Sequence, residues 1–239
     1  MSSIWSKHIS TLLLIACITG FSSCTVTNRN IDQIKDVDGN TYHTVVIGEQ
    51  VWMVENLQAT HLNDGTPIQN VENYDKWSNL TLPSFSWYNN DTMYSSTYGA
   101  LYNFYVVETE KLCPEGWHVP TDEDWTELEK YYEGASVAGG SLKTKGTEFW
   151  KTPNAVAVNA DGFSALPGGY RSYTGTFNLQ RIAGFWWSST QKNWYSAGVK
   201  VLYRNLSYDQ INMVRDIAEK TNGFSVRCIK NQGEAITLK

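Results

Sequence analysis

The sequence predicts an α+β domain built mainly from antiparallel strands, and three observations support this prediction. Residues 41–47 and 50–54 alternate apolar and polar side chains around a two-residue turn. The segment 121–134 has the capping and the spacing of an amphipathic helix. From 163 to 229, short apolar segments are separated by Gly, Ser and Asn, without the strand–helix–strand alternation of a parallel sheet.

The first predicted elements are a turn and a hairpin. Asp36–Asn40 has turn chemistry, and Thr41–Ile47 is connected to Gln50–Val54 by Gly48-Glu49, a hairpin turn with glycine first. The D-x-D-G-N sequence of 36–40 superficially resembles a calcium loop. Its glycine comes two positions too early for an EF-hand and no glutamate follows at position twelve, so we interpret it as a turn.

The predicted helix begins after Thr121, which we expect to be its N-cap. Three carboxylates, Asp122-Glu123-Asp124, follow in the first turn, where they complement the helix dipole. Trp125 and Leu128 recur at helical spacing, and Gly134 is expected to end the helix. Capping accounts for the acidic residues, so no metal or acid–base cluster is inferred from them.

The C-terminal half is expected to form short strands. We predict them at 163–166, 168–171, 185–189, 197–203 and 224–229. Residues 60–98 have no sustained periodicity and are expected to be long loops rich in Asn, Ser, Tyr and Trp.

The composition indicates a folded protein and argues against a nucleic-acid partner. The 239 residues are 41% hydrophobic and 18% charged, with 10 Trp and 14 Tyr, which is enough apolar material for a core. The formal charge is −5, and no run of Lys and Arg could follow a phosphate backbone.

The N-terminus is predicted to be a lipoprotein signal peptide over 1–23. Lys7 precedes an apolar segment too short to span a bilayer, and small residues lead to Cys24. We expect Cys24 to be acylated, palmitate being one of its lipids, and to anchor the chain through a polar tether, 24–33, in the outer membrane, on its periplasmic or cell-surface side. Cys17 also fits such a lipidation motif but would leave a very short apolar segment, and an ordinary secretory signal is the other alternative.

The remaining cysteines, Cys113 and Cys228, favour one disulfide in an exported, oxidising compartment. Two alternatives are weaker. A zinc site would need about two more ligands, and the histidines have no ligand-like spacing. A catalytic thiol at Cys113 would need a partner such as His118, five residues away. No cofactor and no metal are expected.

Six ordered blocks resemble one family, the Fibrobacter succinogenes major paralogous domain. They are DVDGNTYHTVVIGEQVWMVENL (36–57), YGALYNF (98–104), CPEGWHVPTDEDWTEL (113–128), GFSALPGGYR (162–171), FWWSST (185–190) and GFSVRCIK (223–230). We therefore place this domain at 34–231, followed by a polar tail, 232–239.

The resemblance implies a C-type-lectin-like fold, related also to the formylglycine-generating enzyme, with twisted antiparallel strands, one or two helices and long irregular loops. It also implies a bond between Cys113 and Cys228. That bond leaves no cysteine pair for an oxidase of the enzyme branch, and the calcium-binding tripeptides of C-type lectins do not occur. We therefore expect no catalytic residues and no enzyme activity.

The expected function is a cell-envelope lipoprotein that binds a glycan or a surface protein in adhesion. Exposed aromatic side chains stack on sugars or partner side chains at low entropic cost. The candidates lie outside the family blocks: Trp77, Trp87, Tyr88, Trp194 and Tyr195. The alternatives are a structural subunit of a surface appendage or outer-membrane complex, and a hydrolase or oxidase with an unrecognised site. Trp52, Trp117, Trp125, Trp186 and Trp187 are predicted core residues.

Overall fold

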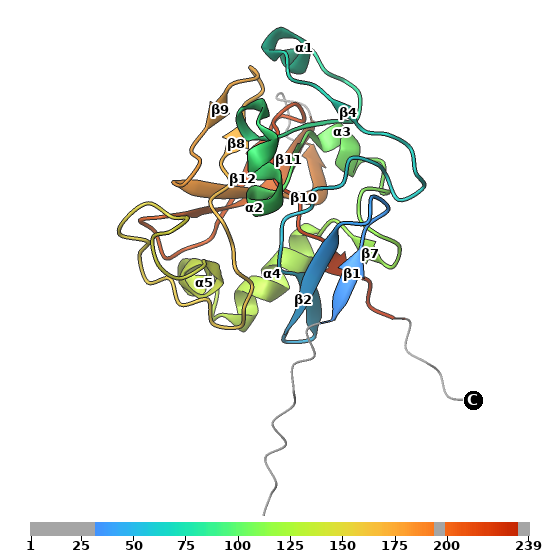
Figure 1. Ribbon diagram of the computed structural model, residues 1–239. Helices are drawn as coiled ribbons and strands as arrows, with labels where there is room; N and C mark the ends of the chain where they lie inside the picture. Colours follow the sequence, from blue (N-terminus) through green and yellow to red (C-terminus); the bar gives the residue numbers. More distant parts are fainter. Residues whose placement is uncertain (1–31, 194–198, 234–239) are drawn as a thin grey trace, which may run out of the picture.

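The computed structural model describes residues 32–193 and 199–233, and Figure 1 shows their arrangement. The predicted α+β class is confirmed: small, mostly antiparallel sheets pack with a few helices and long loops. Cys24, Trp194, Tyr195, the predicted signal peptide and nearly all of the predicted tether lie outside the described residues. No helix in the described ranges is both long and apolar enough to cross a bilayer.

The helices are short, apart from α4 and α5. They are α1 (Tyr74–Ser78), α2 (Ser95–Tyr98), α3 (Phe104–Val107), α4 (Asp122–Tyr131) and α5 (Ala135–Leu142), with 3-10 turns η1 (Tyr88–Asn90) and η2 (Thr92–Tyr94). The strands are β1 (Gln33–Lys35), β2 (Thr41–Ile47), β3 (Gln50–Met53), β4 (Gln69–Asn70), β5 (Ser84–Ser86), β6 (Leu101–Tyr102), β7 (Trp117–His118), β8 (Tyr170–Arg171), β9 (Phe177–Asn178), β10 (Ala183–Asn193), β11 (Val199–Ser207), β12 (Val214–Ala218) and β13 (Ile229–Lys230).

The largest sheet has the order β1-β2-β3-β13-β7 and contains the predicted hairpin. Ile47 pairs with Gln50 around Gly48, whose φ of 60° is the positive value that such a turn needs. The turn at Asp36–Asn40 is also formed, because the Asp36 carboxylate accepts from the Asn40 backbone N–H and from the Tyr42 hydroxyl. These local predictions are confirmed.

The second sheet, β10-β11-β12, includes one strand that the sequence did not reveal. The predicted strand at 185–189 is part of β10, and residues 199–203 of the predicted strand at 197–203 are part of β11. The two strands pair antiparallel with a register shift between Trp187 and Gln191. β12 was missed because VRDIA is largely exposed and shows no apolar alternation. It is held by its ladder with β11.

Two predicted strands, 163–166 and 224–229, form almost no ladder. Their backbone groups pair with single residues of different elements instead of with one neighbouring strand. Phe224 exchanges hydrogen bonds with Tyr102, and Ser225 donates to Phe185 and accepts from Trp187. The segment that begins at Phe224 therefore passes between β6 and β10 and connects their two sheets; we call it the threading segment.

Helix α4 follows the prediction closely. Thr121 is the N-cap and forms a capping box with Asp124. α5 was not predicted, because its two central glycines are weak helix formers. They are needed there: a Cβ on Gly139 would lie 2.5 Å from the Asn212 carbonyl oxygen.

The core is rich in tryptophan. Trp52, Trp125, Trp186 and Trp187 are fully buried, as predicted, and each indole N–H has an acceptor, the Trp187 N–H donating to the Tyr102 carbonyl at 2.7 Å. Trp117 is only half-buried and packs against the edge of the core, which corrects the prediction that it is a full core residue.

Cys113 and Cys228 form a disulfide, with their Cα atoms 6.0 Å apart. Both residues are buried. The bond ties the loop before β7 to the residue preceding β13, 115 positions along the chain. It also answers the question of a catalytic thiol, because Cys113 is not a free thiol.

Candidate binding site

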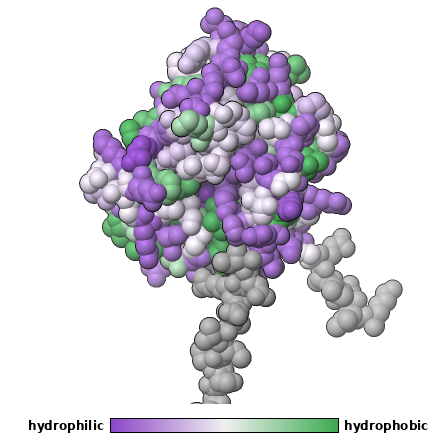
Figure 2. Space-filling view, viewed as in Figure 1, coloured by the Kyte–Doolittle hydropathy of each residue, from purple (hydrophilic) through white to green (hydrophobic). Residues whose placement is uncertain are grey.

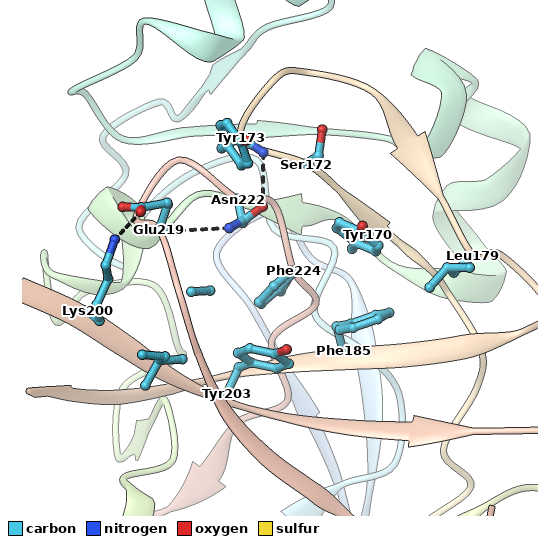
Figure 3. Close-up of a pocket in the computed structure, with 12 residues that line it drawn as sticks. Tyr170, Ser172, Tyr173, Leu179, Phe185, Lys200, Tyr203, Glu219, Asn222 and Phe224 are labelled. Carbon is cyan, nitrogen blue, oxygen red and sulfur yellow. Dashed lines mark hydrogen bonds and ion pairs between the residues drawn. The ribbon is translucent and has the colours of Figure 1, made fainter. Parts of the chain in front are cut away.

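A surface hollow of about 480 Å³ lies over the sheet β10-β11-β12, beside the β8–β9 hairpin. Four aromatic rings, Tyr170, Phe185, Tyr203 and Phe224, form its floor. We call this site the aromatic hollow. Figure 3 shows these four rings gathered on one side, with a polar rim on the other.

The strand register explains why these rings meet. Trp187 pairs with Tyr203, so the two side chains share one face of the sheet, and Phe185, two residues from Trp187, shares that face as well. Phe224 comes from the threading segment and lies against three of these rings, with centroid distances of 5.4 Å to Phe185, 4.9 Å to Tyr203 and 4.2 Å to Trp187. Tyr170 closes the group at 4.7 Å from Phe185.

Exposure decides which rings a ligand can touch. Phe185 and Phe224 are buried beneath the others, whereas Tyr170 and Tyr203 are half-buried and present part of a ring. Tyr173, in the β8–β9 turn, is 55% exposed at the rim. The hollow thus offers the partly exposed rings of Tyr170 and Tyr203 and the exposed side chain of Tyr173, above the buried rings of Phe185 and Phe224.

The rim carries polar groups on the side opposite Tyr170. Lys200 and Glu219 form an ion pair, and the Asn222 amide connects two loops by accepting from the Tyr173 backbone N–H at 2.9 Å and donating to the Glu219 carbonyl at 3.3 Å (Figure 3). Lys200 offers donors and Glu219 offers acceptors next to the rings.

Tyr203 stays neutral over the physiological pH range. Burial raises the pKa of its hydroxyl to about 12, and the nearby Asp216 carboxylate, 3.5 Å from the hydroxyl oxygen, adds to the shift. The hydroxyl therefore keeps its proton and is a hydrogen-bond donor, directed at Asp216, at the edge of the floor.

Three of the predicted aromatic contact residues, Trp77, Trp87 and Tyr88, lie in the described ranges, and none of them lines this hollow. Trp77 is fully buried, with its indole N–H donating to the Thr221 carbonyl at 2.8 Å and its ring stacked on Arg171. It has no surface for a ligand, which corrects its assignment as a contact residue. Tyr88 is only 8% exposed and packs on Phe177, so the same correction applies.

Trp87 is half-buried, with its ring 5.2 Å from that of Phe85, and it does not line the hollow. Trp77 lies on the far side of the β8–β9 hairpin. Arg171 and Phe177 pair across that hairpin and face Trp77, whereas Tyr170 is on the opposite face and lines the hollow.

The residues that sequence reasoning missed are the four floor rings. Alternation in β11 indicates that Val201, Tyr203 and Asn205 share a face. Alternation does not tell which face remains open, because that depends on which loops cover the sheet.

Two further observations concern the polar side chains of the described ranges. No group of three or more His, Cys, Asp and Glu side chains in these ranges is placed to hold a metal ion. His118 lies between Asp124 and Asn231, and the hydrogen bond to the Asp124 carboxylate raises the pKa of its ring.

Comparison with known proteins gives one result. The model of the Fibrobacter succinogenes major domain family matches residues 45–230. No curated protein and no solved structure matches the chain.

Proposed function

We propose that this chain, which belongs to the Fibrobacter succinogenes major domain family, is a non-enzymatic module that binds a carbohydrate in the aromatic hollow. The observation that carries this proposal is the pairing of partly exposed tyrosine rings with a polar rim. An aromatic face receives the apolar C–H face of a sugar ring, while rim groups hydrogen-bond to its hydroxyls.

The size and the charges of the hollow support a small, neutral ligand. About 480 Å³ is within the range of roughly 300–1,000 Å³ that is typical of small-molecule sites. Lys200 and Glu219 neutralise each other, so neither leaves a net charge for an acidic or basic ligand. Both can still bond to hydroxyl groups.

The same charges favour binding over catalysis. A general acid or base would need a side chain whose pKa lies near the working pH. The Tyr203 pKa, raised to about 12, is far above neutrality.

The cellular setting in this proposal is an exported lipoprotein, anchored through Cys24 in the outer membrane, with a C-type-lectin-like fold. The buried disulfide fits an oxidising compartment, and the antiparallel strands with long loops are compatible with such a fold.

A glycan array probed with the mature full chain tests the function. Tyr203→Leu keeps apolar bulk but removes the ring, and Tyr173→Ala changes an exposed side chain; each should lower the affinity for a bound glycan about tenfold, which corresponds to about 1.4 kcal/mol. Tyr131→Ala, an exposed tyrosine outside the hollow, is the matched control.

Thermal unfolding of each variant separates lost binding from lost folding. The proposal would be contradicted if the chain bound no glycan. It would also be contradicted if the Tyr203→Leu and Tyr173→Ala variants bound a glycan with the same affinity as the unmodified chain. The absence of any glycan signal would favour the structural role in an envelope complex.

A further inference from the structure

A second surface, at the end of α4 and along α5, is unusually apolar. Five large side chains lie exposed there: Tyr131 (49%), Val137 (39%), Val156 (66%), Val158 (44%) and Ile211 (40%). All five line one hollow of about 350 Å³. We call it the α5 surface; Figure 2 shows apolar side chains gathered at the lower left, where Figure 1 places α5.

The loop that carries Val156 and Val158 is fixed on α5. The Val158 N–H donates to the Gly140 carbonyl at 2.9 Å, and the Ala160 N–H donates to Ser141 at the same distance. A Cβ on Gly140 would lie 2.9 Å from the Val156 carbonyl oxygen, so glycine permits this close approach. The two valines are therefore held in place, and their exposure is built into the loop.

Val156 occupies a backbone conformation that a β-branched residue rarely adopts. Its φ is +51°, and it is the most exposed of the five side chains. Asn or Gly would relieve the backbone, and a polar side chain would suit the exposure. A strained, exposed valine that lines an apolar surface points to something that covers it.

The position of the α5 surface indicates what that cover is. A Cβ on Gly48, in the β2–β3 turn, would touch the Tyr131 ring at 3.2 Å, so this turn borders the surface. β1 runs antiparallel to β2, and the Thr44 N–H donates to the Asp32 carbonyl. The N-terminal end of β1 is therefore directed toward the β2–β3 turn that contains Gly48.

The distance to the predicted anchor is short. From Cys24 to Asp32 there are eight residue steps, and an extended chain spans at most about 3.3–3.6 Å per residue, roughly 28 Å in total. An acylated Cys24 would keep this end of the domain within that reach of the lipid headgroups.

From these relationships we infer that the α5 surface rests on the lipid bilayer to which the chain is anchored. The inference depends on the lipid anchoring proposed above. Aliphatic side chains enter the boundary between headgroups and acyl chains, and tyrosine is favoured at that interface. Glu133 lines the same hollow, and anionic headgroups would repel its carboxylate. A bilayer of zwitterionic lipids therefore fits this surface.

The contact orients the domain. The β8–β9 hairpin beside the aromatic hollow lies at the upper left of Figure 1, above α5. With the α5 surface on the membrane, the carbohydrate site faces away from it.

Hydrogen exchange of the lipidated full chain on phosphatidylethanolamine–phosphatidylcholine vesicles tests the inference. We expect slower amide exchange in 131–141 and 154–160 on vesicles than in lipid-free solution. Val156→Asn with Val158→Asp should abolish this protection while the chain still floats with the vesicles, because the acyl anchor is intact. Asn tolerates the left-handed backbone of Val156, so the fold should be kept, as thermal unfolding will check.

The matched control is Leu82→Asp, which changes a side chain 61% exposed outside the α5 surface and should leave the protection unchanged. A second arm replaces Cys24 with Ala and holds the mature chain on nickel-chelating lipid through an N-terminal histidine tag. Protection in this arm, combined with a native chain on which mass spectrometry finds no acyl group at Cys24, would refute the anchor and leave the membrane contact standing.

Absence of protection in the tagged arm would overturn the membrane contact itself. Equal protection in lipid-free solution would overturn it as well, since it would assign the α5 surface to a contact between copies of this chain.

Discussion

Arg171 and Trp77 lie face to face, with the guanidinium carbon 4.2 Å from the centroid of the indole ring. The Phe177 ring centroid lies 4.7 Å from the same guanidinium carbon. The N–H groups of Arg171 donate to the backbone carbonyls of Gly175, Val71 and Glu72. A planar, five-donor group is suited to such a site. Arg171 thereby fastens the segment before α1 to the β8–β9 hairpin, whose other face forms a wall of the aromatic hollow.

Replacing this arginine should destabilise the protein strongly. Arg171→Met would leave three carbonyls without their buried donor, and we expect a loss of about 3 kcal/mol or more in the free energy of unfolding. Arg171→Lys should rescue little, because one ammonium cannot follow the fork geometry. Urea denaturation measures both. Arg181→Met, which removes two carbonyl contacts at an exposed side chain, is the control and should cost far less.

The disulfide should contribute a large part of the stability. Cys113 and Cys228 are 115 positions apart, and closure of a loop of this length is worth about 4–5 kcal/mol in the chain-entropy model. Cys113→Ala with Cys228→Ala should lower the free energy of unfolding by that order. Thiol titration of the unreduced, denatured chain should detect neither cysteine; a free thiol at Cys113 would contradict the bond.

His118 should make stability fall as the pH rises above about 6.5. Its ring Nε2 is 3.1 Å from the Asp124 carboxylate, and Nδ1 is 2.7 Å from the Asn231 side-chain oxygen. Two acceptors favour the doubly protonated ring, in agreement with its raised pKa. Because the folded pKa is above the unfolded value, this stabilisation is complete below about pH 6.5 and is lost as the pH rises through the folded pKa.

Unfolding free energies across this pH range, with His118→Gln for comparison, measure the effect, since the variant should lack that pH-dependent part. An NMR titration giving His118 a pKa below that of a free imidazole would contradict the prediction.

Asp122 should contribute to the loss of stability in acid. Its carboxylate is bound by Arg215 and by the fully buried Arg204, with nitrogen–oxygen distances of 2.7 and 2.8 Å, and the Arg215 hydrogen bond is the main cause of a pKa lowered to about 2. Because the folded pKa is below the unfolded value, the ionised Asp122 stabilises the folded protein above about pH 4. This stabilisation is lost as the pH falls from about 4 toward 2. Asp122→Asn should flatten that part of the pH–stability curve, followed by circular dichroism; an unchanged acid transition would refute this role.

The buried pair of Arg204 and Glu129 should be sensitive to the loss of one partner. Arg204 Nε donates to the Glu129 carboxylate at 2.6 Å, and the arginine side chain is fully buried. Glu129→Leu would leave the cation partly unpaired, and we expect a loss of about 3 kcal/mol or more. Glu127→Leu, on the same helix but exposed, is the matched control for chemical denaturation.

Local rules explain what could be predicted. The Gly48 turn, the turn at Asp36–Asn40 and the Thr121–Asp124 capping box depend on residues within a few positions of one another. The disulfide could also be predicted, because the expected loss of Cys17 with the signal peptide and the expected lipidation of Cys24 left two cysteines, both within the family blocks. In each case the determining residues are adjacent or few.

Long-range packing decided the rest. α5 and β12 have weak local signals and are held by contacts with distant segments. The sequence neighbours of Trp77 are polar, which suggested an exposed loop. The ring is nevertheless fully buried, because it packs against Arg171, almost a hundred residues later in the chain.

The sequence alone determined the family, the α+β class, the main hairpin, the capped helix and the cysteine pair. Tertiary structure alone decided which aromatic rings face solvent. Tyr170, Phe185, Tyr203 and Phe224 come from four separate segments, and they form one site because strand register and a threading segment bring them to the same uncovered face. Exposure is a property of the packed molecule, and no residue carries it locally.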